Sequence, residues 1–111
     1  AGVAYSIHPL TGRTAQVMVN SVAGLAAALV DGRVTPDQYV VEMAENCQPI
    51  RICERTVTGQ IQALQVTSQG LCEVPLSDEA VGRATLSDGQ LFELAHTAKQ
   101  IEKAFGYSVD L

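Results

Sequence analysis

Residues 87–111 have the sequence SDGQLFELAHTAKQIEKAFGYSVDL, and this stretch does most to decide the fold class. Ser87 suits a helix N-cap, Asp88 suits the positive end of the helix dipole, and Gly106 suits the left-handed residue that ends a helix. Between them, apolar residues recur at the spacing of one helix face, whereas Glu93, Lys99, Gln100 and Lys103 fall outside that face. The stretch predicts a long amphipathic helix with the apolar stripe Leu91, Leu94, Ala95, Ala98, Ile101, Ala104 and Phe105.

The preceding residues predict strands. GVAYSI and TAQVMVNSV, separated by the turn HPLTG, predict a hairpin, and TPDQYVVEMA predicts a further strand. AGLAAALVDG, between the two, predicts a loop that leads into one or two turns of buried helix. PIRICERTV, GQIQALQVTS and GLCEVPLS predict three more extended segments, in one sheet or two.

The first of these segments, PIRICERTV, alternates in character. Ile50, Ile52 and Glu54 are expected to share one face, with Arg51, Cys53 and Arg55 on the other. The predicted fold class is therefore α+β: a mostly antiparallel sheet with one long C-terminal helix.

Composition limits the classes of function. The 111 residues suit a single domain, and 47% hydrophobic with only 5% aromatic residues predicts an aliphatic core. The net charge is −5, and the seven Lys and Arg residues are scattered, which argues against a nucleic-acid surface. No stretch approaches the roughly 18 apolar residues that cross a bilayer, so no membrane partner is expected.

The cysteines and histidines do not suggest a metal centre. Cys47, Cys53 and Cys72 form no C-x-x-C pair, and His8 and His96 lie far from them in sequence, unlike the ligands of a structural zinc site. We expect free thiols in a reducing cytoplasm, which predicts a cytoplasmic protein. His8, beside a proline, is expected to be an inert surface residue.

Three motifs together resemble a known family. GVAYSIHPLTG and VMVNSVAGLAAALVDGRVTPDQYVV are similar to the family patterns G-V-x-F-[ST]-x-x-P-x-T-G and I-N-A-x-x-G-L-G-E-x-V-V-x-G-x-V-T-P-D-x-[FY]-V-V. The tail resembles L-[ST]-D-x-x-x-x-E-L-A, I-E-x-x-[FY]-G and the start of D-I-E-W. These patterns belong to the nucleotide-binding domain of phosphoenolpyruvate synthase, pyruvate phosphate dikinase and the related rifampin phosphotransferases. The resemblance covers more than half of the chain.

The resemblance implies that residues 1–111 are a single domain and the C-terminal portion of an ATP-grasp nucleotide-binding domain. Such proteins use Mg²⁺ and ATP to phosphorylate a histidine on a swivelling domain, which then passes the phosphoryl group to pyruvate or an antibiotic. The implied partners are ATP, the remaining lobes and the phosphohistidine domain of a parent chain. The fragment alone is expected to be inactive, so no catalytic residue is assigned to it.

Asp110 matches the Asp of D-I-E-W, and the resemblance makes it a magnesium ligand. Alternate residues of a strand share a face, so the Glu two positions later in the family could hold the same cation. That position lies beyond Leu111, and we expect the chain to be a piece of a longer protein. The strand edges left by such a cut would let two copies pair. Alternatively, Asp110 is simply a solvated terminal residue.

Asn20, Gly24 and Leu25 match family positions that the resemblance places at the nucleotide. Ala26 and Ala27, however, stand where the family has Gly and Glu, and a methyl group binds no metal and orients no nucleophile. Asn20 could instead satisfy local backbone groups, and GLAAALV could be a buried apolar turn.

Two other functions therefore stay open. One is a degenerate, non-catalytic relative that serves as a binding or assembly module. The other is a small, self-contained β-rich interaction domain unrelated to the family.

Overall fold

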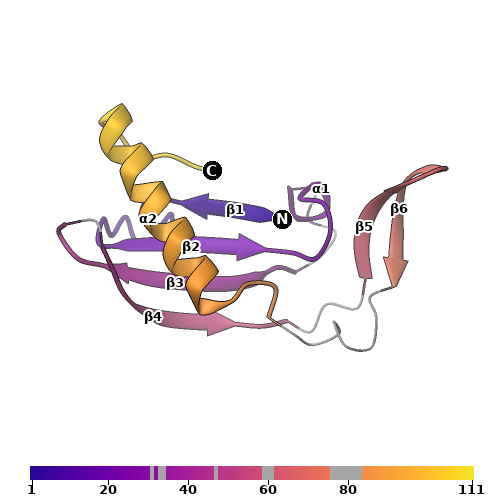
Figure 1. The fold of residues 1–111 in the computed structure, drawn as a ribbon, viewed down its shortest axis with the longest axis horizontal. Coiled ribbons are helices and arrows are strands. Elements are labelled where there is room, and N and C mark those ends of the chain that lie inside the picture. The colour runs from indigo at the N-terminus through magenta and orange to yellow at the C-terminus, as the bar shows by residue number, and fades with distance from the viewer. Residues whose placement is uncertain (31, 33–34, 47, 59–61, 76–83) are drawn as a thin grey trace.

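A four-stranded antiparallel sheet, covered on one face by a long helix, forms the body of the molecule (Figure 1). The computed structural model describes residues 1–30, 32, 35–46, 48–58, 62–75 and 84–111. Its strands and helices are β1 (Gly2–Tyr5), β2 (Gln16–Ser21), α1 (Ala27–Val30), β3 (Asp37–Met43), β4 (Pro49–Thr56), β5 (Gln62–Thr67), β6 (Gly70–Pro75) and α2 (Asp88–Phe105). The α+β class, with an antiparallel sheet and one long C-terminal helix, is confirmed.

The strands follow one another in the sheet in chain order, β1-β2-β3-β4. The hairpin predicted near the N-terminus is present, with Ala4 opposite Val19 and Tyr5 opposite Met18. Successive residues of a strand point to opposite faces. Val17 and Val19 therefore pack in the cluster beneath α2, and Met18 and Asn20 belong to the other face.

The alternation expected in β4 holds for Arg51 and Ile52 but is wrong beyond Ile52, because the pairing of β4 with β3 shifts register between Val40 and Val41, as it does again between Glu42 and Met43. Val41 lies opposite Ile52, but the next residue back along β3, Val40, lies opposite Glu54. Cys53 is thus the extra residue between two pairs, and this reverses the faces beyond it. Ile52 packs toward α2, whereas Glu54 belongs to the opposite face.

Helix α2 has the predicted ends. The Ser87 hydroxyl accepts a hydrogen bond from the Gln90 backbone N–H at 3.3 Å, and the Gln90 side chain accepts one from the Ser87 N–H at 2.9 Å. This capping box satisfies donors that the first helical turn leaves free. Gly106 has φ of 80°, and its N–H donates to the Glu102 carbonyl. A left-handed residue is most easily a glycine, so the helix ends there.

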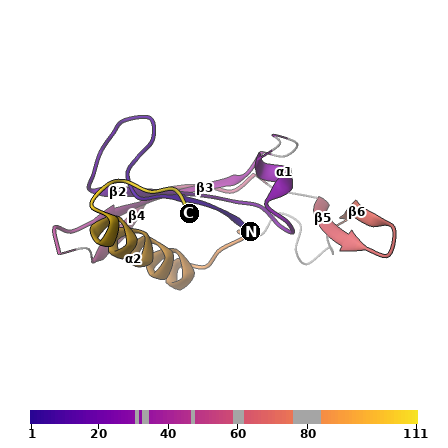
Figure 2. The same ribbon diagram turned by 90° about the horizontal axis from the view of Figure 1, so that it is seen from above.

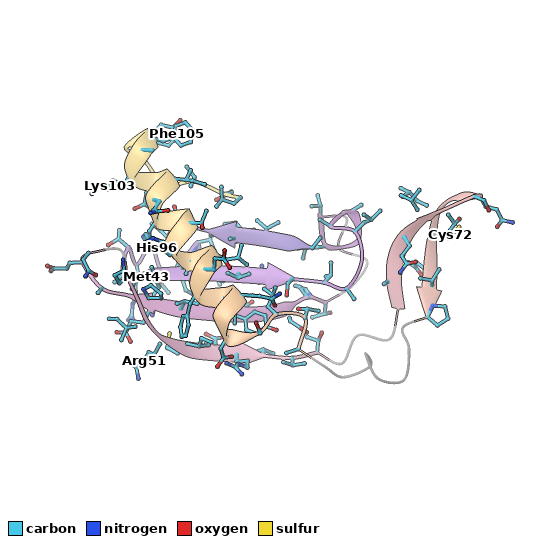
Figure 3. The ribbon with its side chains drawn as sticks, viewed as in Figure 1. Met43, Arg51, Cys72, His96, Lys103 and Phe105 are labelled. Atoms are coloured by element: carbon cyan, nitrogen blue, oxygen red, sulfur yellow. The ribbon has the colours of Figure 1, made fainter. Side chains whose placement is uncertain are left out.

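Figure 2 shows from above that α2 lies along one face of the sheet, and the core is packed between the two. The stripe predicted on α2 is confirmed in its first half but wrong at its end, because Phe105 is 60% exposed and Ala104 is also exposed. Figure 3 shows Phe105 at the C-terminal end of α2, beyond the strands of the sheet. The fully enclosed part of the core comes from β2, β3 and α2: Val17, Val19, Tyr39, Val41, Leu91, Ala95 and Ala98.

Lys99, expected outside the apolar face, is only 6% exposed. Its Nζ donates to the Thr14 carbonyl at 2.6 Å, and it also lies 3.5 Å from both carboxylate oxygens of Glu102. The long aliphatic stem can therefore lie against the core while the ammonium keeps polar partners. The contact ties α2 to the loop between β1 and β2.

Helix α1 is a single turn and is not the buried helix that the sequence predicts. Val30 is 73% exposed and Leu25, just before the helix, is 38% exposed. Figure 2 shows α1 and the loop of residues 6–15 on the side of the sheet away from α2.

Strands β5 and β6 form a separate two-stranded sheet that stands beyond one end of the body (Figure 1). Ala63 is buried, but Val66 and Leu71, which lie opposite each other, are 73% and 61% exposed. None of the helices that the structure describes is long and apolar enough to cross a membrane.

Candidate functional site

The sheet face opposite α2 carries the candidate residue Asn20. Asn20 lies on β2 between Val3 of β1 and Gln38 of β3. Its Oδ1 is enclosed by protein and accepts no hydrogen bond from the described residues. A buried amide oxygen without a donor is costly, since it has lost its water without a replacement. The expectation that Asn20 satisfies local backbone groups therefore fails for this oxygen.

Asp110 lies at the edge of the same face. The chain around it pairs with β1: Ala4 and Leu111 exchange both backbone hydrogen bonds, at 2.9 and 2.8 Å, and Asp110 lies directly opposite Tyr5. Directly opposite residues share a face, so Asp110 belongs to the face of Tyr5 and Met18. The two terminal segments, expected to leave open edges, thus pair with each other over this short distance.

Ser6 strengthens this pairing. It is completely buried, its N–H donates to the Val109 carbonyl, and its hydroxyl accepts from the Val109 N–H at 2.8 Å. The residues on either side of Asp110 are therefore both bonded to β1 and the residue after it: Leu111 to Ala4, and Val109 to Ser6. These bonds fix the position of Asp110. Its side chain remains exposed.

Gly24 and Leu25 follow the end of β2. Gly24 has φ of 77°, a conformation that a residue with a Cβ adopts rarely, and its carbonyl accepts from the terminal amine of Ala1 at 3.2 Å. Ala26 begins the turn of α1, where its carbonyl accepts from Leu29 and Val30. Ala27 is exposed, and its methyl group stands where the motif quoted above has Glu.

The candidate residues share a region but not a single point. Asp110 and Asn20 lie on one face with β1 between them. Asp110 is opposite Tyr5 and Asn20 is opposite Val3, two residues along β1. Standard strand spacings therefore give a distance of about 12 Å between the Cα atoms of Asp110 and Asn20. Gly24 and Leu25 lie beyond the Asn20 end of β2. This arrangement suits an elongated ligand better than a compact one.

A group that the sequence did not single out lies at the same end of the sheet. Asp37, 1% exposed at the start of β3, accepts from the backbone N–H and the hydroxyl of both Thr58 and Thr85, at 2.9 to 3.2 Å. The Thr85 hydroxyl also meets that of Ser21. Asp37 thereby joins the ends of β2 and β4 to the segment that enters α2.

The environment of Asp37 favours its ionised form. Burial is the largest influence and would raise the pKa, but the hydrogen bonds from Thr58 and Thr85 together hold the pKa of this carboxyl below its usual range. The only sequence feature that could have pointed to Asp37 is the Thr-Pro-Asp at the start of β3. Its hydrogen-bond donors Thr58 and Thr85 lie 21 and 48 residues further along the chain. Sequence spacing alone could not identify them.

His8 is not the surface residue that was expected, because only 8% of it is exposed. Its Nδ1 accepts from the backbone N–H groups of Leu10 and Thr11, at 3.3 Å each. Through these two hydrogen bonds His8 holds the turn between β1 and β2.

A divalent cation does not find a complete site in the described part of the chain, where no group of three His, Cys, Asp or Glu residues could hold one. Asp110 supplies one exposed carboxylate. Mg²⁺ in nucleotide sites is often held by one or two carboxylates together with substrate phosphates and water. Asp110 could be one such ligand, but these residues alone do not form a metal centre. Cys47 lies outside the described residues.

Comparison with known proteins gives the same family as the motifs. The whole chain, residues 1–111, matches the family described as pyruvate phosphate dikinase, AMP/ATP-binding domain. The uncharacterized phosphotransferase YvkC of Bacillus subtilis is 31% identical over 111 residues, which cover 100% of this chain and 13% of that protein.

Two further relatives have more specific names. The phosphoenolpyruvate synthase of Pyrococcus furiosus is 29% identical over 118 aligned positions, covering 100% of this chain and 14% of the synthase. The rifampicin phosphotransferase of Streptomyces sviceus is 28% identical over 112 positions, covering 100% of this chain and 12% of that protein. The chain thus spans only a small part of each relative, and it belongs to the family of pyruvate phosphate dikinase AMP/ATP-binding domains.

Proposed function

We propose that this chain is part of the ATP-binding domain of a phosphoenolpyruvate synthase-like phosphotransferase, and that the sheet face opposite α2 contacts the nucleotide. The observation that carries the proposal is the enclosed Oδ1 of Asn20, which lacks a donor among the described residues at a position that matches the family motif. Asn20 as a whole is only half-buried, so its amide can rotate toward solvent, where a ribose hydroxyl or the exocyclic amine of adenine would supply that donor.

The other candidate residues have roles that follow from their positions. Gly24 allows the chain to turn away from β2 without a side chain, so backbone groups beside Leu25 can approach a ligand closely. Asp110 lies about 12 Å from Asn20, at the edge of the same face. It is placed to act on the phosphate end of a nucleotide whose base or sugar lies near Asn20.

Phosphoryl transfer needs mainly positioning of phosphates and neutralisation of their charge. Magnesium bound to ATP would supply much of that neutralisation, with Asp110 as one ligand from this chain. We further propose that the complete protein has the ATP-grasp fold and transfers a phosphoryl group from ATP to a histidine on a swivelling domain. Pyruvate or a similar acceptor would then receive it from that histidine.

The second candidate is a degenerate relative that binds without catalysis. Ala26 and Ala27 favour it, since neither supplies the charge that the family has in this loop, and α1 is exposed rather than folded over a site. Transfer of labelled phosphate from ATP to the complete protein would separate the two functions. Labelled protein supports the transferase, and its absence beside a labelled phosphoenolpyruvate synthase supports the binding module.

Nucleotide contact can be tested on this chain by titrating ATP into isotope-labelled protein and following backbone amide signals. We expect weak binding, with shifts concentrated at Asn20, Gly24 and Asp110 and their strand neighbours. Signals from the outward side of α2 serve as the internal control. Uniform shifts, or none at millimolar ATP, would contradict the proposed face.

Asn20→Leu provides the matched variant, because it keeps the size of the side chain and removes the amide. It should abolish the shifts at Gly24 and Asp110, whereas Gln38→Leu on the neighbouring strand should leave them. If both variants lost the ATP-induced shifts equally, the shifts would depend on the polar character of this sheet face in general and not on the Asn20 amide.

A further inference from the structure

The hydroxyl of Ser6 takes the place of a backbone carbonyl at the end of β1. Ala4 and Leu111 form a regular hydrogen-bonded pair, in which each N–H donates to the carbonyl of the other. Such pairs recur at every second residue of an antiparallel ladder, so Ser6 and Val109 form the next one. Ser6 donates its N–H to the Val109 carbonyl at 3.0 Å, but Val109 donates its own N–H to the Ser6 hydroxyl at 2.8 Å.

This exchange of acceptors occurs where the strand ends. Strand β1 comprises Gly2–Tyr5, and from Ser6 the chain turns into the loop of residues 6–15. Where a chain turns out of a ladder its next carbonyl turns with it, and a side-chain hydroxyl can accept in its place. Because Ser6 is completely buried, a water molecule cannot easily replace that hydroxyl.

The bond at Val109 acts on the residue beside it. Asp110 and Tyr5 form the non-bonded pair of the ladder, so Asp110 directs its own N–H and C=O away from β1. The position of Asp110 therefore depends on the bonds that its neighbours Val109 and Leu111 make. Its exposed carboxylate belongs to the face that carries Asn20, and the Ser6 hydroxyl lies within the sheet, bonded to Val109.

We propose that Ser6 is a positioning residue for the Asp110 carboxylate. Its hydroxyl holds the backbone at Val109, and this keeps the carboxylate on the nucleotide face at a set distance from Asn20. The inference rests on the proposed function, in which Asp110 acts at the phosphate end of the nucleotide. Ser6 itself contacts neither nucleotide nor metal in this role.

Ser6→Ala removes the acceptor with little change in shape. Ser21→Ala is the matched control, because Ser21 is also buried, at 3% exposed, but its hydroxyl meets that of Thr85. Without ligand, the Val109 amide should exchange about tenfold faster in Ser6→Ala, since it has lost its acceptor. The nuclear Overhauser effect between the α protons of Tyr5 and Asp110, which lie close in a non-bonded pair, should weaken. Ser21→Ala should leave both signals as in the wild type.

The effect on the site can be measured with Mn²⁺ and ATP, because paramagnetic Mn²⁺ broadens the signals of nuclei near it. Signals of Asp110 and Tyr5 should broaden in the wild type. Residues that orient a metal ligand typically contribute about tenfold or more to affinity. The ATP concentration that gives half of the broadening should therefore rise about tenfold in Ser6→Ala and stay unchanged in Ser21→Ala. Signals around the exposed Glu73 of β6 report unspecific binding of Mn²⁺ to carboxylates.

The outcomes separate this inference from the proposed function. A wild type whose broadening at Asp110 does not exceed that at Glu73 would contradict the proposed function, and the role of Ser6 with it. Broadening that Ser6→Ala leaves unchanged would overturn the role of Ser6 alone, even if the Val109 amide exchanges faster. An equal loss in Ser21→Ala would assign the effect to general destabilisation and overturn that role too. Loss in Ser6→Ala alone, together with faster exchange at Val109, supports it.

Discussion

The body of the molecule and the β5–β6 hairpin are both antiparallel, but they are stabilised differently. In the body, α2 covers the sheet, and Val17, Tyr39 and Leu91 have no exposed surface. In the hairpin, Val66 and Leu71 face each other across the strands while remaining largely exposed. Backbone pairing alone gives little stability in water, so the body should set the stability of the fold.

The largest effect should come from opening the core of the body. Leu91→Ala removes a fully buried side chain from the contact of α2 with β3 and should cost about 2–5 kcal/mol of unfolding free energy. Leu71→Ala removes the same atoms from the hairpin and should cost less than about 0.5 kcal/mol. Urea denaturation of both variants would measure the difference, and similar costs would mean that the hairpin is part of the same cooperative core.

Substitutions at Asp37 test whether the stability of the body also depends on the buried hydrogen bonds that this carboxylate accepts from Thr58 and Thr85. Asp37→Asn turns one accepting oxygen into a donor that faces the Thr58 or Thr85 groups, and should cost about 1–3 kcal/mol. Thr58→Val removes only a hydroxyl and should cost less. If urea denaturation gave Asp37→Asn the same free energy of unfolding as the wild type, the hydrogen bonds of Asp37 would not contribute to stability.

The same carboxyl makes stability depend on pH. Its pKa is lower in the folded chain than in the unfolded chain, so the unfolded chain binds the proton more tightly. The contribution of Asp37 is therefore fully present above its unfolded pKa of about 3.9, and it is lost as pH falls through the lower folded value. Thermal unfolding between neutral and strongly acidic pH should show a steeper acid loss in the wild type than in Asp37→Asn. Parallel curves would contradict this assignment.

Glycine substitutions distinguish the sheet from the helix within the body. Gly2→Ala should cost more than about 1 kcal/mol, because its Cβ meets the Asn20 carbonyl. Gly89→Ala in the first turn of α2 meets nothing within 4 Å and should stabilise by about 0.4–1 kcal/mol. Melting temperatures of the two variants should move in opposite directions, and an unchanged or higher melting temperature of Gly2→Ala would contradict the close strand approach at Gly2.

Local signals in the sequence predicted the elements well. Ser87 and Gly106 set the ends of α2, and the turn after Tyr5 predicted the first hairpin, because caps and turns depend on residues close in the chain. The bulge at Cys53 was missed, since an extra residue in a strand is visible only from its pairing partner. The same limit applied to Lys99, whose burial depends on the distant carbonyl of Thr14.

The candidate site was predicted by family motifs and not by spacing. Asn20 and Asp110 are 90 positions apart in the sequence, and only the pairing of the C-terminal segment with β1 places them on one face. Asp37 was missed because its threonine partners come from two other segments. Polar groups that act across segments carry no periodic signal, unlike the apolar stripe of α2.

The smallest effect on global stability should come from the hairpin, and it sharpens the comparison with the body. Leu71→Ser should change the unfolding free energy of the body by less than about 0.5 kcal/mol, since Leu71 is mostly exposed. Hydrogen exchange should nevertheless speed up at the β5 and β6 amides, because these bonds open locally without unfolding the sheet. Amides of β2 and β3 should exchange at unchanged rates. If they also accelerated, the hairpin and the body would open as one unit, and the difference between the two regions would be one of exposure and not of stability.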